Sequence, residues 1–145
     1  MGGHESVILL LMSWTKANLR VGYGETDRMG HVYYAHLLVW FEVARSEWCR
    51  ERGVPYTEWE RAGLFLPVVE AWVRYRHPVT YDEEVEIRVR LAKRKASMVK
   101  FEYEATRAGD GLVVAEGYTW HVLVNSERKP VPFPAWFEER AKPSS

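Results

Sequence analysis

The stretch "YAHLLVWFEVARSEWCRERG", residues 34–53, decides the fold of this chain. It contains no proline, and no glycine before Gly53, which stands where a glycine commonly ends a helix. We therefore predict one helix over Tyr34–Arg52. The first half is apolar on nearly every side, and such a helix is normally enclosed by protein. We expect the rest of the chain to wrap around it. The apolar residues are Ala35, Leu37, Leu38, Val39, Trp40, Phe41, Val43 and Ala44.

Strand-like segments flank the helix, because their apolar residues recur at every second position. The first is Leu19–Tyr23, and the later runs are "VVEAWVRYR" (68–76), "EEVEIRVRL" (83–91), "MVKFEYEA" (98–105) and Leu112–Val124. This pattern is typical of antiparallel strands with one buried face. The expected buried positions are Val69, Ala71, Val73 and Tyr75, then Val85, Ile87, Val89 and Leu91, then Val99, Phe101, Tyr103 and Ala105.

Shorter elements follow from their turn and capping residues. The residues "AGDG" at 108–111 predict a hairpin turn. A short helix is expected at Thr57–Ala62, because Thr57 and Glu60 have the spacing of a capping box. One further helical turn is expected at Ala135–Arg140.

The order of these elements, β-α-β-β-β-β, predicts an α+β fold. A five-stranded antiparallel sheet must curl around a long central helix that is apolar all round, as in the hotdog fold. A cystatin-like or nuclear-transport-factor-like cone is the alternative, but one face of its helix should stay polar. We expect residues 1–15 to be an N-terminal extension and residues 16–145 to form one domain, because 145 residues suit a single domain.

The bulk composition excludes several classes of function. The formal net charge is zero, so no global field attracts nucleic acid or an anionic membrane. The one cysteine, Cys49, allows neither an internal disulfide nor a multi-cysteine metal site, and we expect a cytoplasmic protein. The apolar run Val7–Met12 is too short to span a bilayer, which takes about 20 residues.

Candidate chemistry lies between the first strand and the helix, in "GETDRMGHVYY" at residues 24–34. Asp27 stands seven residues before Tyr34, and the turn between them leads to the start of the helix. Backbone N–H groups there lack partners within the helix, and they can bind a developing oxyanion. One carboxylate beside such donors suffices for acyl hydrolysis. A structural turn capped by Asp27 is the other interpretation.

Residues 20–45, "RVGYGETDRMGHVYYAHLLVWFEVAR", resemble the signature of 4-hydroxybenzoyl-CoA thioesterase-like members of the hotdog acyl-CoA thioesterases. The likeness continues through "LPVVEAWVRYRHPVTYDEEVEI", "SMVKFEYEATR" and "RKPVPFP", and so covers about Leu19–Pro134. It implies hydrolysis of an acyl- or aroyl-CoA to free acid and CoA. Asp27 becomes the catalytic carboxylate, as general base or nucleophile, and the backbone N–H near Tyr34 becomes the oxyanion donor. A subgroup linked to the Tol-Pal system has His where this chain has Tyr34, which leaves the acyl preference open.

The resemblance also implies a set of residues that contact the substrate. Glu42 is expected to be buried in the helix and paired with Arg45 or a neighbouring strand, because an unpaired buried carboxylate is costly. His31 and His36 are five residues apart, which does not suit a metal pair on one helix face, so no metal is expected. The expected substrate-binding residues are Gly30, His31, Val32, Tyr33, Ala35 and Glu42.

A basic cluster is expected to hold the phosphates of coenzyme A, which is part of the substrate rather than a cofactor. Its members are Lys93, Arg94, Lys95 and Arg128, with Lys129 beside them. Hotdog sheets pair edge to edge, so a homodimer or homotetramer is expected, with no nucleic-acid or membrane partner. Two other functions remain open: a hotdog hydratase or dehydratase using His31 or His36, and a non-catalytic acyl-CoA-binding module.

Overall fold

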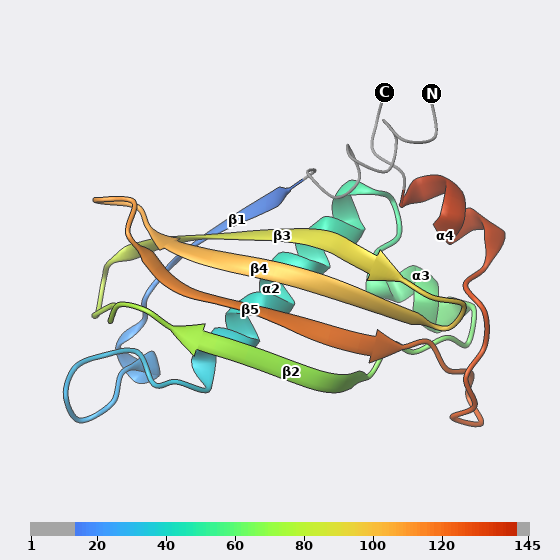
Figure 1. The fold of residues 1–145 in the computed structure, drawn as a ribbon, viewed down its shortest axis with the longest axis horizontal. Coiled ribbons are helices and arrows are strands. Elements are labelled where there is room, and N and C mark those ends of the chain that lie inside the picture. Colours follow the sequence, from blue (N-terminus) through green and yellow to red (C-terminus); the bar gives the residue numbers. More distant parts are fainter. Residues whose placement is uncertain (1–13, 142–145) are drawn as a thin grey trace.

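A computed structural model describes residues 14–141, and a curved sheet wrapped around one long helix dominates it (Figure 1). The sheet is antiparallel and five-stranded, with the strand order β1-β3-β4-β5-β2. Its long middle strands bring residues far apart in the sequence onto one concave surface. The elements are β1 (Thr15–Arg20), η1 (Tyr23–Glu25), α2 (His36–Glu51), α3 (Tyr56–Arg61), β2 (Val68–Tyr75), β3 (Glu84–Arg94), β4 (Met98–Arg107), β5 (Val113–Val122) and α4 (Ala135–Arg140).

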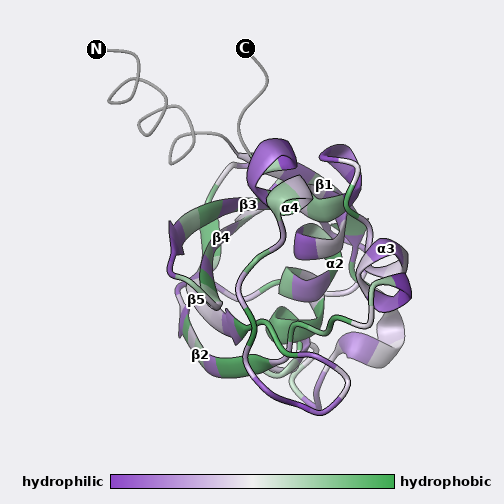
Figure 2. Ribbon diagram, turned by 90° about the vertical axis from the view of Figure 1, so that its right-hand side faces the viewer, coloured by the Kyte–Doolittle hydropathy of each residue, from purple (hydrophilic) through white to green (hydrophobic). Residues whose placement is uncertain are grey.

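Helix α2 lies against the concave face of the sheet, which curves past one side of it in Figure 2. The closest packing is between Phe41 and Tyr103, whose rings stack with centroids 4.3 Å apart. Gly117 makes this approach possible, because a Cβ there would lie 2.9 Å from the Phe41 ring and 2.3 Å from the carbonyl oxygen of Trp72. The absence of a side chain at Gly117 thus allows the helix and the sheet to pack closely.

The core predictions for the central strands are confirmed. The alternating residues of β3 and β4 are all buried, and their register places Val89 opposite Tyr103. Gly53 has φ 70° directly after Arg52, the C-cap of α2, as expected for a glycine that ends a helix. The terminal helix α4 spans the predicted residues, and Gly111 has φ 73° in the hairpin turn before β5.

Several predicted bounds differ by one or two residues, and α2 for example begins at His36 rather than Tyr34; two other differences change which residues form the element. Strand β1 begins at Thr15 and ends at Arg20, because pairing with β3 along its whole length overrides the poor strand propensity of Lys16, Ala17 and Asn18. Thr15 is therefore part of the sheet, while residues 1–13 of the expected extension lie outside the described part. Helix α3 begins at Tyr56 after Pro55, with no side-chain cap, so the capping box at Thr57 does not form.

The expectation that the long helix is fully enclosed is also wrong for a single subunit. Leu38, Val39 and Val43 are 41%, 50% and 47% exposed. The neighbouring edge strand β2 is open as well, so its predicted buried face is uncovered at Val69 and Tyr75. A register shift between Val68 and Glu70 also turns Val68, rather than Val69, toward the helix side, opposite the buried His121. One long apolar surface thus remains at the β2 edge.

Within residues 14–141, no helix has the length and apolar character needed to cross a membrane.

The role of Gly117 predicts a stability effect. Replacing Gly117 with Ala should lower the free energy of unfolding by about 1–3 kcal/mol, because the new methyl group overpacks the contact with Phe41 and the β2 backbone. Urea denaturation measures this. Gly109→Ala is the matched control, since a Cβ at Gly109 meets nothing within 4 Å and its cost should stay within about 0.5 kcal/mol. Equal stability of the two variants would contradict the packing argument.

Candidate active site

The segment between η1 and α2 forms a small closed loop around Asp27. Thr26 pairs with Val32 across it, the N–H of Asp27 donates to the His31 carbonyl at 2.7 Å, and the N–H of Gly30 donates to the Asp27 carbonyl at 3.0 Å. Gly30 has φ 80°, a conformation that favours glycine. Backbone hydrogen bonds within the loop therefore define its shape, and side chains add to them.

The two oxygens of the Asp27 carboxylate have different surroundings. Oδ1 accepts hydrogen bonds from the N–H groups of Met29 at 2.8 Å and His31 at 3.2 Å. Oδ2 has no hydrogen-bond partner among the described residues, and the side chain is exposed. The structural turn and the available carboxylate are thus both present in one residue: one oxygen holds the loop, and the other remains free to accept a proton or attack a carbonyl.

The start of α2 offers free backbone donors. The N–H groups of Tyr34 and Ala35 have no acceptor within the described part of the chain, whereas the N–H of His36 donates to the Tyr33 carbonyl at 2.9 Å. The hydroxyl of Tyr75 donates to the Tyr34 carbonyl at 2.7 Å and fixes this corner to strand β2. The N–H groups of Tyr34 and Ala35 both lie at the positive end of the helix dipole, which favours binding of an anion.

Glu25 anchors this loop, a role that the sequence did not indicate. Its Oε1 accepts from the N–H of Gly22 at 2.8 Å, and its Oε2 accepts from the Trp40 indole at 2.7 Å. Its carbonyl also accepts from the N–H of Tyr33 at 2.8 Å. No sequence spacing connects Glu25 with Trp40, fifteen residues later, because their contact depends on how α2 packs.

The predicted substrate-binding residues are only partly together. Gly30, His31, Val32, Tyr33 and Ala35 lie in the loop or at the helix start, beside Asp27 in the chain. Glu42 lies farther along α2 and is exposed, so the prediction of a buried Glu42 paired with Arg45 is wrong. Arg45 instead donates from Nε to the Tyr56 hydroxyl at 2.8 Å and from Nη1 to the Tyr103 hydroxyl at 3.0 Å.

A directed chain of hydrogen bonds runs from Arg45 into the core. His121 Nδ1 lies 3.0 Å from the Leu66 carbonyl, which can only accept, so Nδ1 carries the proton and Nε2 accepts from Thr119 at 2.8 Å. The Thr119 hydroxyl must then accept from Tyr103 at 2.6 Å, and Tyr103 accepts from Arg45. Period-2 alternation places Thr119 and His121 on the inner face of β5 with Gly117, and this alternation is the sequence signal that points to them.

Arg45 is 7% exposed and has no carboxylate partner among the described residues. Its Nη2 group also has no hydrogen-bond partner among the described residues. Arg45 lines two hollows. The larger is a cleft of about 890 Å³ between α2, α3, the segment that leads into β2 and the end of β5. Its lining includes Glu42, Arg45, Tyr56, Trp59, Phe65, Leu66, Asn125 and Arg128. The smaller hollow continues along α2 past Leu38, Val39 and Ala71.

The predicted phosphate cluster lies at the opposite end of the subunit from Asp27. Strand β3 begins beside β1 at Glu84, near the Asp27 loop, and ends at Arg94, roughly 33 Å away at 3.3 Å per residue. Figure 1 shows these two ends of the sheet on opposite sides. Two of the cations already have partners: Arg94 pairs with Glu138 at 2.6 Å, and Lys95 lies over the Trp120 ring. Lys93 and Arg128 are exposed at the same end.

Other reactive groups are accounted for. Among the described residues, no group of three or more His, Cys, Asp or Glu side chains could hold a metal ion. Cys49 is buried in the core, and this burial raises the pKa of its thiol to about 12, so it stays protonated.

The curved sheet around one helix is a hotdog fold, and its loop carries one available carboxylate beside free helix-start donors. The chain belongs to the thioesterase-like superfamily, whose family model matches residues 21–141. This is a family of acyl-CoA and aroyl-CoA thioesterases.

Individual relatives span nearly the whole chain. It is 26% identical over 132 residues to a 1,4-dihydroxy-2-naphthoyl-CoA hydrolase of Thermosynechococcus vestitus, covering 86% of this chain and 89% of the relative. The structure of the DHNA-CoA thioesterase from Staphylococcus aureus superposes with a TM-score of 0.82 at 28% identity, covering 86% and 87%. The hypothetical protein TT1821 of Thermus thermophilus gives a TM-score of 0.83 at 32% identity, covering 88% and 96%.

The buried hydrogen bonds of His121 predict a loss of stability in acid. Burial, aided by the nearby charge of Arg45, lowers the pKa of His121 to about 4. The unfolded chain, with an ordinary pKa of about 6.5, therefore binds the proton first. Stability should be complete above pH about 6.5 and should fall by up to about 3 kcal/mol as the pH drops to about 4.

Urea denaturation across this pH range measures the effect. His121→Gln is the informative variant, because glutamine can donate to Leu66 and accept from Thr119 but does not titrate. The variant should lose most of the acid dependence. An unchanged pH slope would assign the acid sensitivity to other groups.

Proposed function

We propose that this protein hydrolyses acyl-CoA thioesters at Asp27. The observation that carries the proposal is the half-engaged carboxylate: Oδ1 is held by Met29 and His31, while Oδ2 has no partner in the described chain. The unpaired N–H groups of Tyr34 and Ala35 support it, because they suit a carbonyl oxygen that becomes negative in the transition state. Membership of a thioesterase family supports it independently.

Two routes use the same residues. In the first, Asp27 accepts a proton from water as the water oxygen attacks the thioester carbon. In the second, the carboxylate attacks that carbon directly, and water then hydrolyses the resulting anhydride. In both, the oxyanion is stabilised at the helix start, the carbon–sulfur bond breaks, and the CoA thiolate takes up a proton. No metal or redox cofactor takes part.

The working unit we propose is a two-fold dimer joined at the β2 edge. Open apolar side chains on β2 and α2 support this, including Val39, Val43, Trp72 and Tyr75. Antiparallel pairing of two β2 strands would set the Tyr75 end of one subunit beside the Val68 end of the other. The Asp27 loop would then meet the partner subunit's Arg128 and the cleft beside it. Pantetheine would enter between the subunits, with phosphates toward the basic residues.

The acyl group would lie in the two hollows along α2, whose lining on that helix begins at Leu38. Their lining is mainly apolar and aromatic, and the polar members are Glu42, Arg45, Glu60, Thr119, Asn125, Ser126 and Arg128. A hydroxylated aromatic acyl group suits such a lining, and the relatives named for naphthoyl-CoA support that class for this chain as well.

Replacing Asp27 with Asn should reduce turnover of acyl-CoA by at least about a hundredfold, because the amide can neither accept the proton nor attack the carbonyl. Free-thiol release over a panel of aromatic and aliphatic acyl-CoAs measures this. Asn at position 27 keeps an oxygen for the Met29 and His31 N–H groups, so the loop should keep its shape.

Glu139→Gln is the control. Glu139 is an exposed carboxylate on α4, which lies at the end of the subunit opposite the Asp27 loop, and this variant should retain wild-type turnover. Undiminished hydrolysis by the Asp27 variant would remove Asp27 from the mechanism. A wild type that binds acyl-CoA without releasing thiol would instead indicate a binding module.

Replacing Val39 with Glu should convert the oligomer to monomers, because the charge would be buried in an apolar interface without a partner. Light scattering measures the mass, and circular dichroism checks that the subunit remains folded. Leu112→Glu, at a 40% exposed position in the β4–β5 hairpin, is the control and should remain oligomeric. A monomeric wild type, or an oligomeric Val39 variant, would contradict the proposed interface.

A further inference from the structure

We propose that Arg107 is a positioning residue for the Asp27 loop, acting through the segment that joins β2 to β3. The inference rests on the proposed function for its catalytic consequence, but its structural part stands by itself. Arg107 is far from Asp27 in the sequence and does not touch it. The connection consists of three contact layers: Arg107 to residues 78–83, these residues to the loop, and the loop to the carboxylate.

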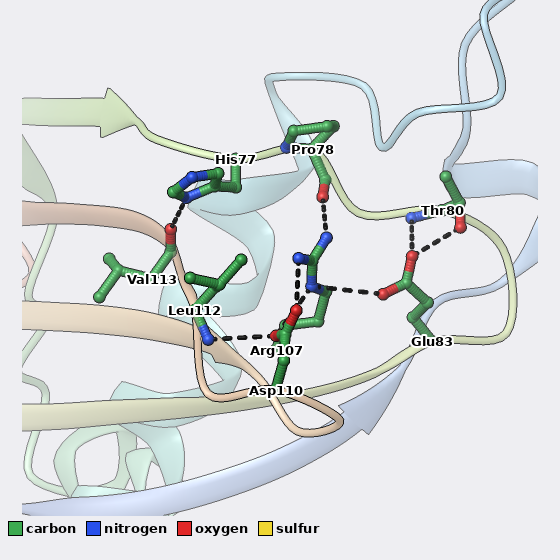
Figure 3. A network of polar contacts seen from close by, with 8 residues as sticks. All are labelled: His77, Pro78, Thr80, Glu83, Arg107, Asp110, Leu112 and Val113. Carbon is green, nitrogen blue, oxygen red and sulfur yellow. Dashed lines mark hydrogen bonds and ion pairs between the residues drawn. The ribbon is translucent and has the colours of Figure 1, made fainter.

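The first layer is the polar network in Figure 3. The Arg107 guanidinium donates from Nη1 to the Pro78 carbonyl at 3.2 Å, and its Nε lies 3.8 Å from Glu83 Oε2. Glu83 Oε1 in turn accepts from both the N–H and the hydroxyl of Thr80, at 3.1 Å and 2.6 Å. Arg107 therefore binds the segment 78–83 directly at Pro78 and, through Glu83, at Thr80.

Arg107 is itself held firmly. It makes a two-point contact with Asp110 in the β4–β5 hairpin, from Nη2 at 2.6 Å and from Nε at 3.1 Å. The hydrogen bond from Arg107 lowers the pKa of the Asp110 carboxyl below its ordinary value, so both charges are present at neutral pH. The N–H of Leu112 also donates to Asp110 at 3.2 Å, and this closes the turn behind the arginine.

The second layer joins the gripped segment to the loop. The N–H of Val32 donates to the Val79 carbonyl at 2.9 Å, and His31 pairs with Thr80 as an isolated bridge. Val79 is buried, while Pro78 and Thr80 on either side are exposed. The polar contacts of Arg107 with Pro78 and of Glu83 with Thr80 restrain those exposed flanks, in addition to the bridge between Thr80 and His31.

The third layer reaches the carboxylate. His31 both accepts the Asp27 N–H and donates its own N–H to Asp27 Oδ1. A shift of residues 78–80 would therefore move His31 and, with it, the oxygen that fixes the carboxylate. Catalysis is sensitive to such shifts, because a displacement of about 1 Å can cost about a hundredfold in rate.

Arg107→Gln tests the inference, with Arg88→Gln as the matched control. Arg88 is a similarly half-exposed arginine of the same sheet, paired with Glu104, and it contacts no residue of the 78–83 segment. Hydrogen exchange followed by mass spectrometry should show residues 26–34 exchanging at least about fivefold faster in the Arg107 variant than in the Arg88 variant.

Turnover adds a readout that a purely structural role would not move. In the Arg107 variant, kcat should fall at least about tenfold, while KM changes by less than about twofold, because the carboxylate is misplaced but the binding groove is intact. Glu83→Gln provides a second variant if the first folds poorly. It keeps an acceptor for Thr80 and the Arg107–Asp110 pair, and it should give the same changes in smaller measure.

Unchanged exchange in residues 26–34 would overturn the inference, and so would faster exchange with unchanged kcat. A wild type that releases no thiol from any acyl-CoA would overturn the proposed function instead. In that case the exchange comparison still decides whether Arg107 orders the loop.

Discussion

The contact between α2 and the sheet at Phe41, Tyr103 and Gly117 is the constraint on which the rest of the molecule depends. Because Gly117 has no side chain, the Phe41 ring can stack on Tyr103 and the helix can lie close to the strands. This close approach sets the direction of α2. Its first residues then face the Asp27 loop, and Arg45, one turn after Phe41, turns toward the polar residues of β4 and β5.

Arg45 shows how the fold tolerates a buried charge. Removing a guanidinium from water is unfavourable unless hydrogen bonds replace those of the solvent. The Tyr56 and Tyr103 hydroxyls supply two such bonds, and Thr119 and His121 continue the chain to a backbone carbonyl. From Arg45 Nη1 through Tyr103, Thr119 and His121 to the Leu66 carbonyl, each donor has one defined acceptor, so this series of bonds favours a single arrangement of the core beside the cleft.

The Asp27 loop depends on contacts from three directions. Its own backbone closes the turn, Glu25 ties it to Trp40 on α2, and Val79 and Thr80 hold its far side. The catalytic role that we propose for Asp27 requires such support, because a carboxylate that moves loses its alignment with the proposed oxyanion donors. The open β2 edge has the opposite character: its apolar residues are uncovered within one subunit, which is why we propose an interface there.

The sequence by itself determined the elements and their order, since helix and strand periodicities are local and strong in α2, β3 and β4. It also indicated Asp27 and the helix start, because they are close in the chain and share a recognisable motif. Only the tertiary structure decided that Glu42 is exposed, that Arg45 binds tyrosines, that Glu25 and Arg107 support the loop, and that the basic cluster lies at the far end. Those outcomes depend on which distant strands meet, and side-chain periodicity carries no information about such partners.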